Sequence, residues 1–183
     1  MLAPVVSGAG FGAVVSGAGN GSTGHLAVEL FKNVSGIALT HVPYKGGGPA
    51  LTEVIAGQVQ AMFSLALVAS PQIKVGKVRG LAITSAKRSR VAPELPTVAE
   101  LGFPGFEVIG WFGWLAPART PSDVVVRLHG DIVKALHAPE TQDRLIALGS
   151  EPVGNASSAF AAFVRAERDK WGGVIQRAGI RLD

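Results

Sequence analysis

The chain has 183 residues, of which 48% are hydrophobic and 16% are charged, and its formal net charge is +4. This length favours one domain with a buried core, and the low charge content excludes an intrinsically disordered protein. The sequence contains no cysteine, which excludes disulfides, zinc–thiolate sites and cysteine nucleophiles.

The distribution of basic and apolar residues argues against two classes of partner. Lys87, Arg88 and Arg90 form the only basic cluster, and no aromatic residues are interleaved with it, so we expect no nucleic-acid binding. No apolar run approaches the roughly 20 residues of a membrane span, so we expect no direct membrane insertion. Residues 1–19 contain no Lys or Arg and many glycines, so they do not read as a signal peptide.

The first half of the chain alternates between strand-like and helix-like segments. After an irregular lead-in over residues 1–18, with a possible short strand at Val14 and Val15, this alternation predicts an α/β sheet with parallel strands. Ser22 or Thr23 is expected to cap the first helix, and Gly36 is expected to end it. The predicted strands cover 37–44, 59–67 and 78–86. The predicted helices cover 22–35 and 49–56, and 68–77 is predicted as a short helix or a turn.

The second half changes in style near residues 106–118, which we interpret as a domain crossover. A proline-rich loop precedes an aromatic strand predicted at 109–118. Three consecutive helices are then predicted at 122–137, 139–148 and 159–179. The expected helix starts are Thr120 as N-cap with Pro121 at the first helical position, Pro139 opening the second helix, and Ser157 or Ser158 capping the third.

One glycine motif allows several readings. Gly19, Gly21 and Gly24 form G-x-G-x-x-G, but a dinucleotide fingerprint also needs an acidic residue about 20 positions later to hold the ribose. His41 stands near that position instead, so we expect no dinucleotide cofactor. The motif also lacks the Gly-Lys-Ser/Thr of a phosphate-binding P-loop, and Asn20 replaces the first glycine of a serine nucleophile elbow.

A glycine-rich helix start can nevertheless hold an anion. The free backbone N–H groups of the first turn and the positive end of the helix dipole favour a carboxylate, and Ser22 and Thr23 add hydroxyl donors. The alternative is that both residues only cap the helix. A second glycine loop at the next strand-to-helix junction, with Tyr44 and Lys45 before Gly46–Gly48, favours a binding site, although Lys45 could be an ordinary exposed lysine.

The histidines raise an enzymatic alternative. His25 or His41 could act as a base in a small α/β enzyme that uses an organic acid. Neither histidine has an acidic partner in the sequence, and no His/carboxylate cluster has metal-ligand spacing. We therefore assign no catalytic residue and no metal site.

Several segments together resemble one known family. They are GNGSTGHLAVELF, HVPYKGGGPALTEVIAGQVQAMF, GKVRGLAITSAKRS, APELPTVAELGFPGFEV and the C-terminal LGSEPVG…FAAFVRAERDKWGGVIQRAGIRLD. Their order and spacing resemble those of the Bug proteins, the extracytoplasmic solute receptors of tripartite tricarboxylate transporters. The resemblance covers residues 19–183.

The resemblance implies a periplasmic-binding-protein type II-like α/β fold, in which two lobes close on a small ligand. Family ligands are mostly carboxylates or other small organic acids, held by backbone and hydroxyl donors without catalysis or cofactor. The resemblance further implies a periplasmic location and membrane transporter subunits as partners. By position, it implies a ligand site of Gly21, Ser22, Thr23, Gly24, His25, Tyr44, Lys45, Gly46, Gly47, Trp111 and Phe112. Trp111 and Phe112 could instead serve core packing.

The chain departs from the family pattern at its start. Family members begin with a secretion signal and a first-lobe section, whereas the match here starts with the second lobe. We therefore expect one complete α/β lobe over 19–106, and over 107–183 a crossover strand with helices that complete the other lobe. The chain is expected to be a truncated family member, and an inactive one is an alternative. Without a first lobe, the tail should expose apolar residues, among them Leu128, Ile132, Leu136, Phe160 and Phe163.

Overall fold

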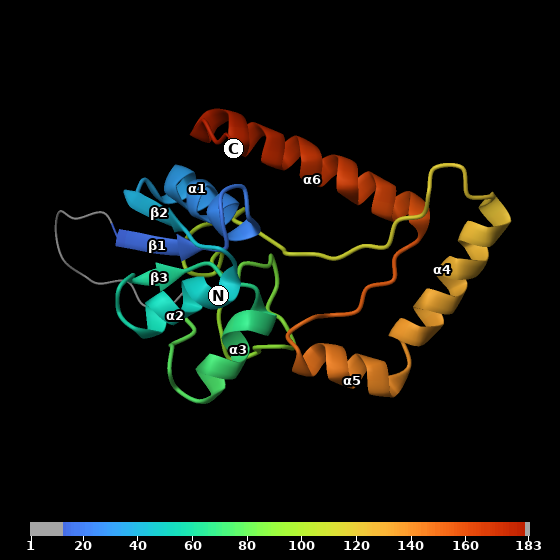
Figure 1. The fold of residues 1–183 in the computed structure, drawn as a ribbon, viewed down its shortest axis with the longest axis horizontal. Helices are drawn as coiled ribbons and strands as arrows, with labels where there is room; N and C mark the ends of the chain where they lie inside the picture. The colour runs from blue at the N-terminus through green and yellow to red at the C-terminus, as the bar shows by residue number, and fades with distance from the viewer. Residues whose placement is uncertain (1–12, 182–183) are drawn as a thin grey trace.

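The computed structural model describes residues 13–181 (Figure 1). Its sheet has three parallel strands in the order β2-β1-β3, which are β2 Leu39–Pro43, β1 Ala13–Gly17 and β3 Ala61–Met62. The central strand β1 pairs with β2 from Ala13↔Leu39 to Gly17↔Pro43. The predicted parallel α/β sheet is confirmed, and the predicted short strand at Val14 and Val15 is its centre.

Helices on both faces cover the sheet. α1 (Thr23–Ser35) contacts β1 and β2, and α2 (Gly47–Ile55) contacts β1 and β3. Alternation along β1 separates the two faces: Val15 packs in the core with α1, whereas the Ser16 hydroxyl donates to the α2 carbonyl of Ala50 at 3.2 Å. α3 (Ala66–Lys74) follows β3 and contacts α2. Each of these three helices therefore begins just beyond the carboxyl end of a strand.

Local sequence chemistry sets the ends of α1. Ser22 is the N-cap, and its hydroxyl accepts the His25 N–H at 3.3 Å. Gly36 is the C-cap, with a left-handed φ of 68° that favours glycine. Both predicted ends are confirmed, with Ser22 rather than Thr23 as the cap.

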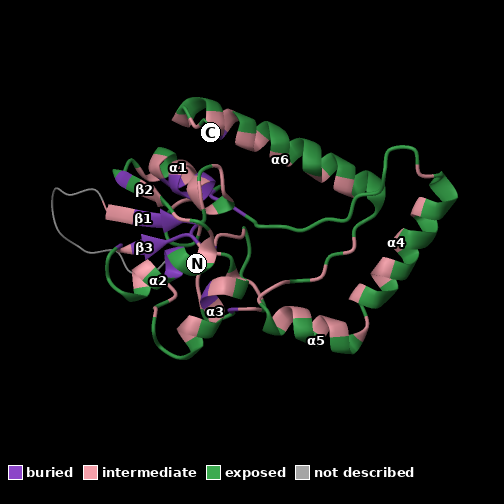
Figure 2. Cartoon of the chain, in the orientation of Figure 1, coloured by how far each residue is buried: buried purple, intermediate pink, exposed green. Residues whose placement is uncertain are grey.

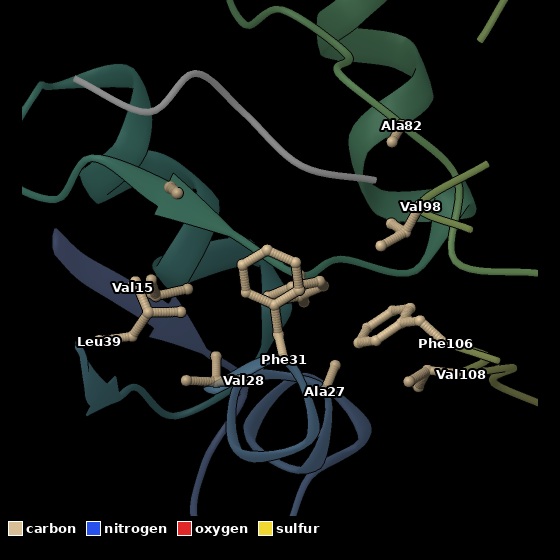
Figure 3. Packing of buried hydrophobic residues seen from close by; sticks show 11 residues of the cluster. Val15, Ala27, Val28, Phe31, Leu39, Ala82, Val98, Phe106 and Val108 are labelled. Carbon is tan, nitrogen blue, oxygen red and sulfur yellow. The ribbon is translucent and has the colours of Figure 1, made fainter. Parts of the chain in front are cut away.

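The main core lies between the sheet, α1 and the loops that follow α3 (Figure 3). Phe31 contacts Phe63, Phe103 and Phe106, and the last of these contacts is edge-on with ring centroids 5.8 Å apart. Figure 3 shows Phe106 and Val108, from the segment after the proline-rich loop, facing α1. Residues 97–108, which are mostly turns and irregular chain, thus complete the core without a strand of their own.

Three strand predictions are wrong in extent or altogether. The strand predicted at 59–67 is only Ala61–Met62, because α3 begins at Ala66. The segment 78–86 forms a single bridge, Ile83↔Thr97, whose ladder does not extend past Pro96, a residue that has no N–H to donate. The segment 109–118 is not a strand, since no neighbouring segment of the described chain pairs with it.

The last three helices lie at the edge of this unit. They are α4 Ser122–Leu136, α5 Pro139–Ala147 and α6 Ser157–Ala178. Figure 2 shows that α4, α5 and most of α6 are exposed or intermediate in burial. α6 joins the core near its C-terminal end, where Val174 is buried and Trp171 packs against the main core cluster. No helix of residues 13–181 is long and apolar enough to cross a membrane.

The predicted helix starts in this half were partly wrong. Pro139 opens α5 as expected, but Pro121 is the N-cap of α4 and Ala156 that of α6, and neither makes a side-chain capping bond. Leu128 is exposed as predicted. The other four predicted apolar residues, Ile132, Leu136, Phe160 and Phe163, are intermediate in burial.

Candidate ligand site at three helix starts

A pocket of about 190 Å³ opens at the carboxyl ends of β1 and β3. The first turn of α1, the start of α2, the segment from β3 into α3, and Thr84, Val108 and Gly110 surround it. Its lining consists of Ala18, Ser22, Thr23, Gly24, Ala27, Gly47, Met62, Phe63, Ser64, Leu65, Val68, Thr84, Val108 and Gly110. In a parallel sheet, this edge is where ligands bind.

The starts of α1, α2 and α3 converge on the pocket. Thr23 is the first residue of α1, Gly47 is the first of α2, and Leu65 is the N-cap of α3, and all three line it. The first N–H groups of a helix have no partner within the helix, and the macrodipole places roughly half a positive charge at this end. Three such ends surround one cavity, so the field there favours an anion.

The pocket lining combines apolar walls with neutral donors. None of the lining residues in the described chain carries a formal charge. Hydroxyl groups come from Ser22, Thr23, Ser64 and Thr84, and the apolar walls come mainly from Met62, Phe63, Leu65, Val68 and Val108. An anionic group beside an apolar chain is the chemistry that such a lining accommodates.

The β1–α1 turn brings its backbone close to the pocket. Gly19 and Gly21 have φ values of 130° and 71°, which favour glycine. Gly24 is constrained by space instead: a Cβ atom there would lie 2.8 Å from the backbone oxygen of Phe63. Within residues 13–181, the N–H groups of Thr23 and Gly24 have no hydrogen-bond acceptor.

Two stacked histidines lie beside this turn, and one of them is hydrogen-bonded to it. The rings of His25 on α1 and His41 on β2 are stacked, with centroids 3.9 Å apart and an interplanar angle of 4°. His25 Nδ1 accepts the Gly21 N–H at 3.1 Å. Burial lowers the pKa of both imidazoles, that of His41 to about 4, so both are neutral at pH 7. Neither ring lines the pocket.

The structure brings together some of the predicted site residues and separates others. Ser22, Thr23, Gly24 and Gly47 line the pocket; Gly21, His25, Tyr44, Lys45, Gly46, Trp111 and Phe112 do not. Gly21 and His25 form the turn behind the pocket wall. Trp111 instead packs edge-on against Phe160 and Phe163 of α6, with centroids 5.6 and 5.4 Å away, and Phe112 is 79% exposed.

Several lining residues carried no functional signal in the sequence. Met62, Phe63 and Val108 are buried apolar residues, and in the sequence they resemble any other core residue. Thr84 reaches the pocket because Val108 N–H donates to its carbonyl at 2.8 Å, which joins two segments far apart in sequence. The end of a buried strand beside a glycine loop was the one signal that could have indicated them.

Replacing Ser22 by alanine is expected to lower the free energy of unfolding by about 1 kcal/mol, since it removes the acceptor for the His25 N–H. Urea denaturation followed by circular dichroism measures this change. Ser157→Ala is the matched control, because Ser157 lies at the start of α6 without being its N-cap and should change stability by less than about 0.5 kcal/mol. Equal losses in both variants would contradict the capping role.

Comparisons with known proteins identify the family. The sequence profile described as "Tripartite tricarboxylate transporter family receptor" matches residues 13–180. Protein BugT of Bordetella pertussis is 36% identical over 162 residues, covering 88% of this chain and 50% of BugT. The "UPF0065 protein in clcB-clcD intergenic region" of Pseudomonas knackmussii is 38% identical over 159 residues, covering 86% of this chain and 94% of that protein.

Structural similarity points the same way. The structure described as "R. palustris Rpa4515 with adipate" has a TM-score of 0.83 and 36% sequence identity, covering 92% of this chain and 56% of that one. The chain spans about half the length of most of the curated relatives it matches. The chain belongs to the tripartite tricarboxylate transporter receptor family, the Bug-type solute receptors.

Proposed function

We propose that this chain binds a small organic carboxylate without transforming it, as a solute receptor of a tripartite tricarboxylate transporter does. The observation that carries the proposal is the convergence of three helix starts on one pocket whose described lining has no charged side chain. Backbone N–H groups and hydroxyls can hold a carboxylate, while the apolar wall contacts its carbon chain.

The adipate described with the R. palustris protein supports a linear dicarboxylate as the ligand class. Adipate carries a carboxylate at each end of a four-carbon chain, and this pocket offers donors for one end and an apolar wall for the chain. We propose that residues 19–106, together with the central strand β1 that precedes them, form one lobe of the receptor, and that residues 107–183 are the crossover and part of the other lobe. The second carboxylate would then meet the opposite lobe.

A receptor role accounts for the histidines better than an enzymatic one. Neither His25 nor His41 forms an ion pair or hydrogen bond with a carboxylate in the described chain, and neither lines the pocket. A general base must reach the reacting atom, directly or through one water. We therefore propose no catalysis and no cofactor at this site. Transporter subunits in the membrane and a periplasmic location complete the proposal.

An NMR titration of the ¹⁵N-labelled chain with adipate tests the proposal. Adipate should shift the amide signals of Thr23, Gly24 and Gly47, because they line the pocket, and should leave that of Gly172 on α6 unchanged. The double variant Thr23→Val/Thr84→Val should bind about tenfold more weakly, through loss of hydroxyl donors. Thr52→Val, on α2 outside the pocket lining, is the matched control.

Hexane-1,6-diol provides the ligand control, since it has the same carbon chain without carboxylates. It should leave the Thr23 and Gly24 amides unshifted at concentrations where adipate shifts them. Equal responses to diol and adipate, or no response of the pocket amides to adipate and other linear dicarboxylates, would overturn the proposal.

A further inference from the structure

The stacked His25–His41 pair is attached to the ligand-binding turn by one hydrogen bond. The Gly21 N–H donates to His25 Nδ1 at 3.1 Å. Gly21 belongs to the β1–α1 turn and directly precedes the N-cap Ser22. Nδ1 can accept only while it carries no proton, so the neutral ring holds its hydrogen on Nε2. A protonated ring would present a second N–H to that of Gly21 and break the bond.

His41 fixes the plane of the His25 ring. The two rings are parallel within 4°, and His41 Nε2 is buried without a hydrogen-bond partner in the described chain. His41 fits there because residue 17 is glycine: a Cβ on Gly17 would overlap His41 Nε2. The ring of His25 is therefore held between the turn it supports and a second imidazole.

The surroundings of the pair favour two neutral rings. The main cause of the lowered pKa values is burial, and in His41 the neighbouring His25 adds to it. Glu29 raises both pKa values and Lys32 lowers them; both lie on α1 and pair with each other at 2.9 Å. β1, packed beside β2, carries no charged side chain.

We propose that His25 is a positioning residue for the ligand site, and that protonation of the His25–His41 pair releases the β1–α1 turn and weakens carboxylate binding. This inference rests on the proposed function, because it concerns the regulation of the same site. Neutral rings hold Gly21, and through it the N–H groups of Thr23 and Gly24, in the binding geometry. Acid removes the acceptor, and the turn loses its support.

The direction with pH follows from linkage. The imidazoles have lower pKa values in the folded chain than in the unfolded one, so the unfolded chain binds more protons between pH 6.5 and about 4. The free energy of unfolding therefore has its full value above pH 6.5, and it decreases as the pH falls through this window. Ligand affinity should follow the same direction.

The first experiment needs no ligand, so its outcome is independent of the proposed function. A long-range ¹H–¹⁵N NMR spectrum of the wild-type chain at pH 7.5 should show the proton of His25 on Nε2 and none on Nδ1. On acidification, the Gly21 amide signal should move with the same midpoint as the His25 ring. A proton on Nδ1 at pH 7.5, or a Gly21 amide that does not follow the His25 titration, would overturn the inference.

The second experiment measures adipate binding at pH 7.5 and pH 4 in wild type and His25→Asn. The amide oxygen of asparagine can occupy the place of Nδ1 and accept the Gly21 N–H, but it does not titrate. Wild type should lose at least about twofold more affinity on acidification than His25→Asn does, because about half of a group with a pKa near 4 is protonated at pH 4. Both proteins share the ionisation of adipate itself, so the difference reports on the chain.

Two further variants complete the test. His25→Ala should bind adipate weakly at both pH values, and His25→Asn should restore binding at pH 7.5. His129→Asn on α4, whose ring contacts the Asn155 carbonyl far from the turn in sequence, should retain the wild-type pH dependence. Identical pH profiles in wild type and His25→Asn would overturn the proposal while leaving carboxylate binding itself intact.

Discussion

Replacement of Phe106 by alanine is expected to lower the free energy of unfolding by about 3–5 kcal/mol. Phe106 is only 1% exposed, and its ring lies edge-on to Phe31 and 6.1 Å from the ring of Phe63. The cavity left behind would lie where the segment after the proline-rich loop meets α1 and β3, and neither neighbour can move in to fill it without breaking its own contacts. Urea denaturation followed by circular dichroism measures the change.

Phe112→Ala is the control for this prediction. Phe112 is the same residue type six positions later, but it is 79% exposed, so its removal should change stability by less than about 0.5 kcal/mol. A Phe106→Ala variant within about 1 kcal/mol of wild type would show that residues 97–108 are not part of the cooperative core.

Gly24→Ala is expected to destabilise the chain by about 1–3 kcal/mol and to weaken adipate binding at least tenfold. The added Cβ would lie 2.8 Å from the Phe63 backbone oxygen, which cannot rotate away as a side chain can. The first turn of α1 must therefore shift from the end of β3. Since Gly24 and Phe63 both line the pocket, that shift also displaces its donors.

Gly48→Ala provides a matched control, because Gly24 and Gly48 are each the second residue of their helix. No atom lies within 4 Å of a Cβ placed on Gly48. Alanine there should stabilise the chain by up to about 1 kcal/mol, through its higher helix propensity, and leave adipate binding unchanged. Thermal unfolding and the NMR titration measure both effects. A Gly24→Ala variant as stable as Gly48→Ala would contradict the close approach of α1 to β3.

Short-range chemistry explains which parts of the fold could be predicted. The ends of α1 depend on Ser22 and Gly36, and the parallel sheet follows from the alternation of strand-like and helix-like segments. The two glycine loops could be placed at one edge of the sheet for the same reason. These features depend on residues only a few positions apart.

The remaining features depend on contacts between distant segments. The apolar run at 109–118 has a strand-like composition, but a strand also needs a neighbour with free backbone groups, and the described chain offers none. Trp111 was assigned to the site through the family resemblance, yet here it packs on Phe160 and Phe163. Burial of the two histidines depends on the pairing of β1 with β2 and on Gly17, which no single segment reveals.

The docking of α6 on α1 has a consequence for the order of folding. The contact joins the first and last helices of the described chain, and it brings Trp171 against a core otherwise formed by residues 13–108. Closing so long a loop is entropically costly, and little burial in α4 and α5 offsets that cost on the way. We therefore expect the sheet and its first helices to assemble before α6, which docks on them last.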